Sequence, residues 1–324
     1  MTAIDYGATA SAPEAARSIS KAEERQIARD LSPPVAWPTL GLTVLLPVAF
    51  AALVFAGFQE VLPLWACTML IALVAYGHFT LLHEAIHGNV VSSPKSLLWV
   101  NSLVGWIGAV GVGLGWPALR RGHLLHHSHT NTDRDPDIFA KGTFVQLLGK
   151  WAMSVPFSLV PMTVMSRIGR SNSRYAALRS EMSAWEMHGA SLPGYLTLGL
   201  LGAALLTGHF TEWLLLWFIP QRLAFLILQI FFQWLPHYPF DRDDRYGNTR
   251  ISLWMFGTAL TFQQNLHLMH HLWPGVPFYN YGRLFVALRP VLEAEGARIE
   301  GLGVGPLARP VPPLGSKVER KRTP

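Results

Sequence analysis

The sequence predicts an all-α integral membrane protein, with four transmembrane helices in two hairpins and a cytoplasmic helical cap. Three observations predict this class. Only 14% of the 324 residues are charged, whereas an ordinary soluble domain contains about 25%. Half of the residues are hydrophobic, and many of them gather in runs near the roughly 20 residues that a helix needs to cross a bilayer. Eight of the thirteen histidines form three short clusters outside the centres of these runs.

The charge balance and the cysteine count exclude several functional classes. The formal net charge is +6, a mild excess that suits an anionic membrane surface and does not by itself indicate nucleic acid. Cys67 is the single cysteine of the sequence. An intramolecular disulfide, a thiolate zinc site and a cysteine-ligated iron–sulfur cluster are therefore excluded.

The apolar runs predict two helical hairpins. The first pair covers 38–58 and 62–82, joined by a link short enough to force a hairpin. The second pair covers 194–206 and 213–235. The last of these runs carries Arg222 near its middle, which predicts that this side chain faces a cavity or neighbouring helices.

The distribution of cationic residues predicts the orientation of the hairpins. No Lys or Arg occurs between Arg29 and Lys95, or between Arg179 and Arg222. They cluster instead in the N-terminal tail, in 167–179 and after Arg242. Because cytoplasmic loops collect Lys and Arg, we expect a multi-pass protein of the inner, cytoplasmic membrane with both termini and the long middle segment in the cytoplasm.

The remaining segments complete the expected organisation. The apolar stretch 97–119 is interrupted by glycine, proline and asparagine, so we expect it to be re-entrant or interfacial rather than spanning. The stretch 142–165 is also expected at the interface. One membrane domain then covers 33–300. It is preceded by a disordered or interfacial tail, 1–32, with a short surface helix, and followed by a disordered basic tail, 301–324.

The three histidine clusters have the spacing of metal ligands. Intervals of three or four residues place imidazoles on one helical face, and adjacent histidines diverge by about 100° and can reach two different metals. Eight imidazoles are too many for one tetrahedral zinc but suit two metals with open positions. Two clusters repeat the pattern H-x-x-H-H, which favours metal binding over a chance gathering at the membrane surface. The clusters are HEAIH (His83, His87), HLLHH (His123, His126, His127) and HLMHH (His267, His270, His271).

The membrane setting bears on the identity of the metal. Imidazole suits iron, zinc, copper and nickel. A substrate drawn from the membrane as an apolar chain would offer no carbonyl or phosphate group to a Lewis acid. Oxidising its unactivated C–H bonds would need an oxidant made from O2, which redox-inert zinc cannot supply. Two iron ions with O2 as co-substrate are therefore favoured, although the spacing alone does not distinguish iron from manganese.

In this order and with these gaps, the clusters resemble the three histidine boxes of the membrane fatty acid desaturase superfamily. The resemblance covers 64–288 and extends to the flanking sequences HTNTDRDPD (129–137) and HHLWPGVPFYNY (270–281). It implies four spanning helices, boxes at the cytoplasmic face and two irons bound chiefly by histidine. It also implies a further ligand, which matches His237 in QWLPHYPF, and a water-mediated ligand at Gln233.

The flanking sequences also indicate a substrate class. The segment 234–250 and the residues after the third box look like those of bacterial carotenoid-ring hydroxylases. Hydroxylation of a carotenoid ring is the activity that this resemblance implies. Desaturation of an acyl lipid and ketolation of the ring remain open.

Polar residues near the second box are candidate partners of the ligands. A ligating histidine usually donates its other N–H to a carboxylate or carbonyl group. The alternative is that these residues cap a turn, because DPD is a favourable turn sequence. The candidates are Asp133, Asp135, Asp137 and Asn131, with Glu84 in the first box.

Two other functional classes compete with an oxidoreductase. HEAIH also satisfies H-E-x-x-H, the zinc metalloprotease pattern in which Glu84 would be the general base, but such a site leaves six boxed histidines without a role. A metal transporter or metal buffer would need ionisable residues along the spanning helices, and beyond Arg222 there are few.

An oxidoreductase of this kind needs a separate electron donor. With one cysteine the chain cannot hold a cysteine-ligated cluster, and no glycine-rich dinucleotide fingerprint follows a strand. We therefore expect a ferredoxin or a b-type cytochrome with its reductase. The basic segments 167–179 and 242–250 could dock an acidic donor or bind anionic headgroups.

Overall fold

The computed structural model describes residues 19–137, 141–168, 182–254 and 256–301. The chain divides into two compact units. We call Pro34–Leu235 the central unit, and Met1–Pro33 with Pro236–Pro324 the terminal unit. The sequence predicted a single domain over 33–300 and did not indicate this division. The predictions for 1–18, 169–181 and 302–324 lie outside the described residues.

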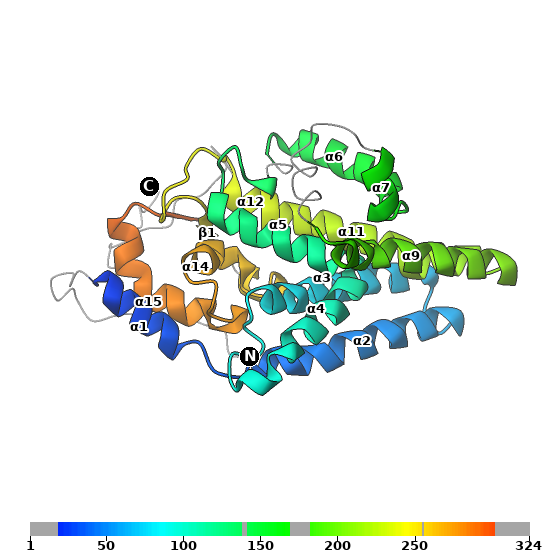
Figure 1. Cartoon of the computed structure of the whole chain (residues 1–324), viewed down its shortest axis with the longest axis horizontal. Coiled ribbons are helices and arrows are strands. Elements are labelled where there is room, and N and C mark those ends of the chain that lie inside the picture. Colours follow the sequence, from blue (N-terminus) through cyan, green and yellow to red (C-terminus); the bar gives the residue numbers. More distant parts are fainter. Residues whose placement is uncertain (1–18, 138–140, 169–181, 255, 302–324) are drawn as a thin grey trace, which may run out of the picture. The chain divides into compact units, whose positions relative to one another are not determined.

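The central unit is built around one apolar helix, α3 (Leu64–Ile86), which forms a hairpin with α2 (Trp37–Phe58). Every side chain of α3 from Ala75 to Ile86 is buried. The reason is that α3 packs against α2, α4 and α11, as Figure 1 shows. The first predicted hairpin therefore matches the structure closely. Both helices begin within two residues of the predicted positions, and α2 ends at Phe58 as predicted.

Glycine allows the next helix to approach α3. The short 3-10 helix η1 (Lys95–Leu97) leads into α4 (Trp99–Val112), which ends at Gly113 with a positive φ of 73°. A Cβ atom added to Gly108 would lie 2.6 Å from the backbone nitrogen of Leu82. Only glycine therefore permits this packing distance. The helix α5 (Trp116–His129) follows after a short break.

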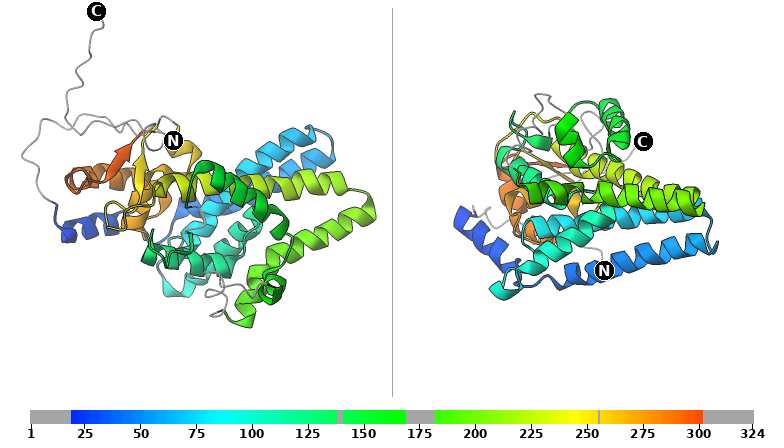
Figure 2. Two further views of the ribbon diagram at one scale, coloured as in Figure 1. Left: turned by 90° about the horizontal axis from the view of Figure 1, so that it is seen from above. Right: turned by 45° about the vertical axis from the view of Figure 1, so that its right-hand side comes forward.

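The second hairpin begins earlier than the sequence predicted. The helix α9 (Ala184–Thr207) starts ten residues before the expected run, because Ser183 and Glu186 form a capping box. Gly208 ends α9 in the left-handed conformation, and the chain turns back there, with the two arms diverging from the turn in the left view of Figure 2. The returning elements are α10 (Phe210–Trp213), the π-helical η3 (Leu214–Phe218), α11 (Ile219–Leu228), the π-helical η4 (Gln229–Trp234) and α12 (Leu235–His237).

Two shorter helices complete the central unit. The helix α6 (Phe144–Phe157) begins with a capping box made by Thr143 and Gln146, and α7 (Met162–Ile168) follows. The indole nitrogen of Trp151 donates a hydrogen bond to the carbonyl of Arg222, which ties α6 to α11.

Among the described residues, five helices are long and apolar enough to cross a membrane. Four of them cover the predicted runs to within two residues, and the additional candidate is Lys95–Val112. The prediction of a mostly helical chain with several helices that could span a membrane is confirmed. The count of four spans and the cytoplasmic cap stay predictions.

The terminal unit joins the N-terminal helix to the C-terminal part of the chain. The helix α1 (Lys21–Asp30) packs against α15 (Tyr281–Ala294). Buried Glu24 of α1 accepts a hydrogen bond from the Tyr246 hydroxyl at 2.8 Å. Four short helical segments precede α15 in the sequence of the terminal unit. They are α13 (Gly257–Leu260), η5 (Gln264–Leu266), α14 (His267–Leu272) and η6 (Phe278–Asn280).

The terminal unit also contains a two-stranded parallel sheet, which the sequence did not predict. The strands β1 (Arg250–Ser252) and β2 (Arg298–Glu300) have three residues each. An ion pair of 2.9 Å joins Arg250 to Glu300 at the two ends of this sheet. Three residues are too few for an alternating pattern to be recognised in a sequence.

Candidate metal centre

Five histidines meet at one place in the central unit, and we call them the central histidine cluster. The end of α3 supplies His83 and His87, and α5 supplies His123, His126 and His127. Ligand nitrogens of His83, His87 and His123 lie within 4.8 Å of one another. The Nε2 atom of His123 lies 3.0 Å from Nε2 of His87 and 3.1 Å from Nε2 of His127.

These distances fit a shared metal ion. Two nitrogens that each lie about 2.1 Å from one ion are about 3.0–3.4 Å apart in tetrahedral or octahedral geometry. Burial lowers the pKa of His87 to about 3. Burial also holds the pKa of His123 well below its ordinary value, and the charges of the neighbouring histidines lower it further. Both rings are therefore neutral at pH 7, with a nitrogen lone pair available to a metal.

Asp135 supports His126 from behind. Its Oδ1 lies 2.8 Å from Nδ1 of His126, and both side chains are buried. Burial opposes protonation of His126, but the charge of Asp137 and the hydrogen bond with Asp135 raise its pKa overall. Asp135 also accepts backbone hydrogen bonds from Asn131 and Asp137. The two interpretations offered by the sequence, partner of a ligand and cap of a turn, therefore both describe Asp135.

The other candidates near the second box differ in position. Asp137 has an oxygen 3.9 Å from Nδ1 of His126. Burial raises the pKa of the Asp137 carboxyl group above its ordinary value. The Gln233 amide lies near Asp137 and opposes this rise in the pKa. Asp133 is exposed at the surface, and Asn131 contributes its backbone N–H to Asp135 in a left-handed conformation.

Four histidines meet in the terminal unit, and we call them the terminal histidine cluster. His237 ends α12, and α14 supplies His267, His270 and His271. The Nε2 atoms of His267 and His271 are 3.2 Å apart. The ring of His237 lies 5.2 Å from that of His267 and 5.1 Å from that of His271, centroid to centroid. All nine predicted histidines therefore belong to one cluster or the other.

The sequence did not identify three supporting side chains. The hydroxyl of fully buried Tyr281 lies 3.0 Å from Nδ1 of His270. Phe79 stacks on His83 with centroids 5.9 Å apart, and Phe232 meets the same ring edge-on at 4.9 Å. The interval of four residues between Phe79 and His83 was a usable signal. Nothing in the sequence distinguishes Tyr281 from the other aromatic residues of its segment.

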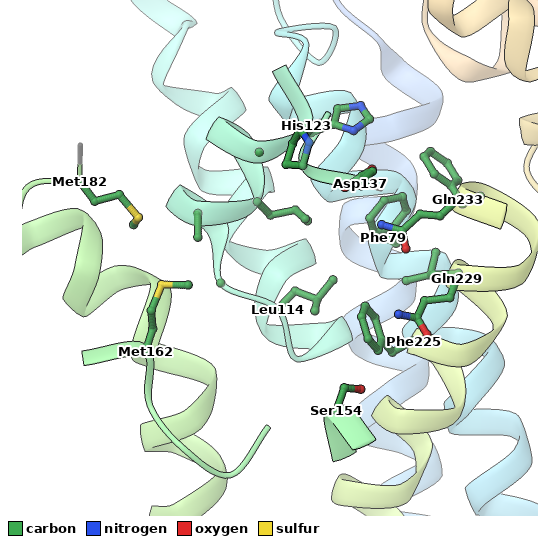
Figure 3. A pocket seen from close by; sticks show the side chains of 17 residues that line it. Phe79, Leu114, His123, Asp137, Ser154, Met162, Met182, Phe225, Gln229 and Gln233 are labelled. Carbon is green, nitrogen blue, oxygen red and sulfur yellow. The ribbon is translucent and has the colours of Figure 1, made fainter. Parts of the chain in front are cut away.

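A cavity of about 390 Å³ lies beside His123 within the central unit (Figure 3). Its wall is mostly apolar and includes Leu114, Met162, Met182, Phe225 and Leu228. The polar side chains that line it are His123, Asp137, Ser154, Gln229 and Gln233. The cavity thus offers an apolar molecule a place next to the central histidine cluster.

Three other histidines have different surroundings. His78 places Nδ1 2.9 Å from the carbonyl oxygen of Val74 within α3. His188 stacks on Tyr195, and His209 lies 3.6 Å from Glu212. None of these three belongs to the two clusters as described.

The basic segment 242–250 is largely compensated by nearby acids. Arg242 binds Asp244 at 2.7 Å, and Arg245 lies 3.5 Å from Glu24. Arg250 is buried and paired with Glu300. The segment therefore offers an acidic partner less unbalanced charge than its sequence indicates.

Comparison with known proteins relates most of the chain to one family. The family model described as "Fatty acid desaturase" matches residues 59–302. A beta-carotene ketolase from Paracoccus sp. (strain PC1) is 29% identical over 218 residues, which cover 65% of this chain and 74% of the relative. A second beta-carotene ketolase, from Paracoccus sp. (strain N81106 / MBIC 01143), is 28% identical and covers 64% of this chain and 72% of its own. The sn-1 oleoyl-lipid 12-desaturase of Picosynechococcus sp. (strain ATCC 27264 / PCC 7002 / PR-6) is 24% identical over 80% of this chain and 78% of its own.

Proposed function

Because the chain belongs to the fatty acid desaturase family, and is therefore an oxidoreductase, we propose that it oxidises a carotenoid ring at a C–H bond. The observation that carries this proposal is the similarity to two beta-carotene ketolases over about two thirds of the chain. The apolar cavity beside His123 supports it, because a hydrocarbon ring is held best by an apolar wall.

Ketolation is preferred to the hydroxylation that the sequence indicated, because the similar carotenoid enzymes are ketolases. The two reactions share their first step. One hydroxylation of a ring CH2 group gives an alcohol, and a second at the same carbon gives a geminal diol that loses water to a ketone. The product mixture therefore distinguishes one oxidation from two.

We propose that both histidine clusters serve this reaction and that their nine members bind two iron ions. When bound, the irons would supply the reductive activation of O2. The donor set fits them, because it consists of imidazoles with nitrogens about 3 Å apart and with hydrogen-bonding groups behind two of the rings. The proposed ligands are His83, His87, His123, His126, His127, His237, His267, His270 and His271.

The surrounding side chains then have separate tasks. Asp135 fixes the orientation of His126 by accepting its Nδ1 hydrogen, and Tyr281 orients His270 through its hydroxyl. Phe79 and Phe232 pack on His83 and exclude water from that side of the ring. Gln233 and Asp137 lie close together at the edge of the cavity.

The setting of the reaction follows the sequence prediction. We propose that the lipid enters from the bilayer, that the chain lies in the inner membrane with both termini in the cytoplasm, and that a ferredoxin or b-type cytochrome with its reductase supplies two electrons per turnover. The compensated charges of 242–250 make that segment a weaker docking candidate than its sequence suggests.

Desaturation of an acyl lipid is the second candidate function. It is favoured by the similarity to an oleoyl-lipid desaturase, which extends over 80% of the chain. Membership of the desaturase family argues against a zinc metalloprotease in which Glu84 is the general base.

Expression in two hosts tests the proposal. The full chain is produced in a host that makes β-carotene and in a host with defined acyl chains, and the lipids are analysed by mass spectrometry. We expect ketone-bearing carotenoids and unchanged acyl chains. A new acyl double bond with unchanged carotenoid would contradict the proposal and favour the second candidate. His271→Ala should abolish the product, whereas His188→Ala, outside both clusters, should retain it.

A further inference from the structure

Gln229 is an exceptional side chain in the wall of the cavity. It is completely buried, and its position beside Phe225 can be followed in Figure 3. Within the part of the chain that the structure describes, neither Oε1 nor Nε2 of Gln229 has a hydrogen-bond partner. A primary amide in apolar surroundings thus has its full hydrogen-bonding capacity unused.

Neighbouring polar side chains of the cavity are engaged with protein groups. The Gln233 amide lies near the Asp137 carboxyl group, whose pKa it lowers. The hydroxyl of Ser154 donates to the carbonyl of Trp151 at 2.7 Å. His123 belongs to the central histidine cluster. Gln229 therefore differs from Ser154 and His123 in offering both an unused donor and an unused acceptor.

The local backbone gives a reason to regard this amide as part of the site. Gln229 is the first residue of the π-helical segment η4, and single π-helical turns occur frequently at functional sites. Phe225, Gln229 and Gln233 follow one another at intervals of four residues, and all three line the cavity. The helix thus turns a continuous line of side chains toward the cavity.

An unused amide in this place is costly unless a ligand pairs with it. Burying an amide without a hydrogen bond is unfavourable, and leucine or methionine would fill a similar volume without that cost. A purely hydrocarbon ligand offers the amide no partner. A ligand that carries a hydroxyl or carbonyl group does.

We propose that Gln229 binds an oxygen atom of the lipid held in this cavity, so that the chain prefers a ring that already carries a hydroxyl or carbonyl group over the plain hydrocarbon ring. This inference rests on the proposed function for its ring substrate. It makes Gln229 a specificity-determining residue, and it places a hydroxylation of the ring before the preferred reaction of this chain.

A binding experiment with matched probes tests the inference. The full chain, loaded with iron in lipid nanodiscs, is titrated by calorimetry with a trimethylcyclohexenyl alcohol and with the corresponding hydrocarbon. We expect the native chain to bind the alcohol roughly tenfold more tightly, in line with the usual effect of leaving a buried polar group unpaired. In Gln229→Leu this preference should disappear. Leu228→Met, a change in a neighbouring apolar residue of the wall, should keep it.

Further measurements keep the result interpretable. Iron content and thermal stability verify that Gln229→Leu is folded, and Gln229→Met repeats the test if it is not. Equal affinity of the native chain for both probes would overturn the inference, and so would an alcohol preference that survives in the Gln229 variants. A preference that depends on Gln229 in a chain that leaves carotenoids unchanged in the host would support the inference and contradict the carotenoid substrate.

Discussion

The two histidine clusters use the same ligand chemistry but are supported differently. The central cluster draws on two helices, α3 and α5, and a buried carboxylate, Asp135, holds one of its rings. The terminal cluster takes three of its four rings from α14, a helix of six residues, and a neutral phenol, Tyr281, holds one of them. The long helix α3, buried from Ala75 to Ile86, supports the first arrangement, whereas in the second the short helix α14 packs against β1, η5 and α15. The comparison predicts where each cluster is vulnerable.

Loss of one ring from either cluster should have the largest effect. His123→Ala and His267→Ala should each lower carotenoid oxidation by at least about 100-fold and lower the bound iron, because both clusters serve one reaction in our proposal. Product formation and iron by mass spectrometry measure the two effects. A chain that keeps full activity after either substitution would show that the corresponding cluster is dispensable.

Removal of the supporting groups should separate the clusters. Asp135→Asn should weaken iron binding by about 10- to 100-fold, and Tyr281→Phe by about 10-fold or less, because a charged acceptor at 2.8 Å holds a ligand more strongly than a neutral hydroxyl at 3.0 Å. Competition with a chelator gives both affinities. Asp133→Asn, at an exposed carboxylate, is the control and should change little. Equal losses of iron affinity in Asp135→Asn and Tyr281→Phe would show that the charged and the neutral partner support their ligands equally well.

A smaller effect, on stability alone, should come from the packing that supports the central cluster. Gly108→Ala places a Cβ atom 2.6 Å from the backbone of α3, and we expect it to lower the free energy of unfolding by about 1–3 kcal/mol. Gly149→Ala is the matched control, because no atom lies within 4 Å of an added Cβ there. Thermal unfolding in detergent compares them. A Gly108→Ala chain as stable as the control would mean that the helices separate at little cost.

The smallest effect should come from a surface pair of the terminal unit. Hydrogen bonding to Arg242 lowers the pKa of Asp244, so its contribution to stability is present above the ordinary aspartate pKa and is lost as the pH falls through the lowered value. Half of the Asp244 side chain is exposed, so Asp244→Asn should cost less than about 1 kcal/mol at pH 7. Unfolding at pH 7 and at pH 3 should show the difference shrinking toward acid. A stability difference between the native chain and Asp244→Asn that grows toward acid would contradict a stabilising ion pair between Arg242 and Asp244.

The clusters could be predicted from the sequence, whereas much of their support could not. Histidines at intervals of three and four residues share a face of any helix, so their spacing alone predicted the two groupings within α5 and α14. Asp133, Asp135 and Asp137 look equivalent in sequence, and the fold of one turn decides that Asp135 meets His126. The partnership of Tyr281 with His270 depends on how α15 begins against α14, which no local pattern records.

The spanning helices show the same limit. Uninterrupted apolar runs fixed α2 and α3 to within a few residues. The first ten residues of α9 were missed because they include Glu186 and His188, which reduce hydropathy without preventing a helix. Gly108 explains why a glycine-rich stretch that looks interrupted forms the continuous helix α4: its small residues permit close packing on α3.

The position of the cavity has a kinetic consequence. Phe79 of α3 and Phe225 of α11 both belong to helices that can span a membrane, and both line the cavity. A lipid that arrives there from within the bilayer has already left water. The free energy of its transfer out of water therefore does not help the cavity to select one lipid over another. In our proposal, turnover should then follow the mole fraction of the lipid in the surrounding membrane. Adding inert phospholipid at constant total substrate should slow the reaction by surface dilution.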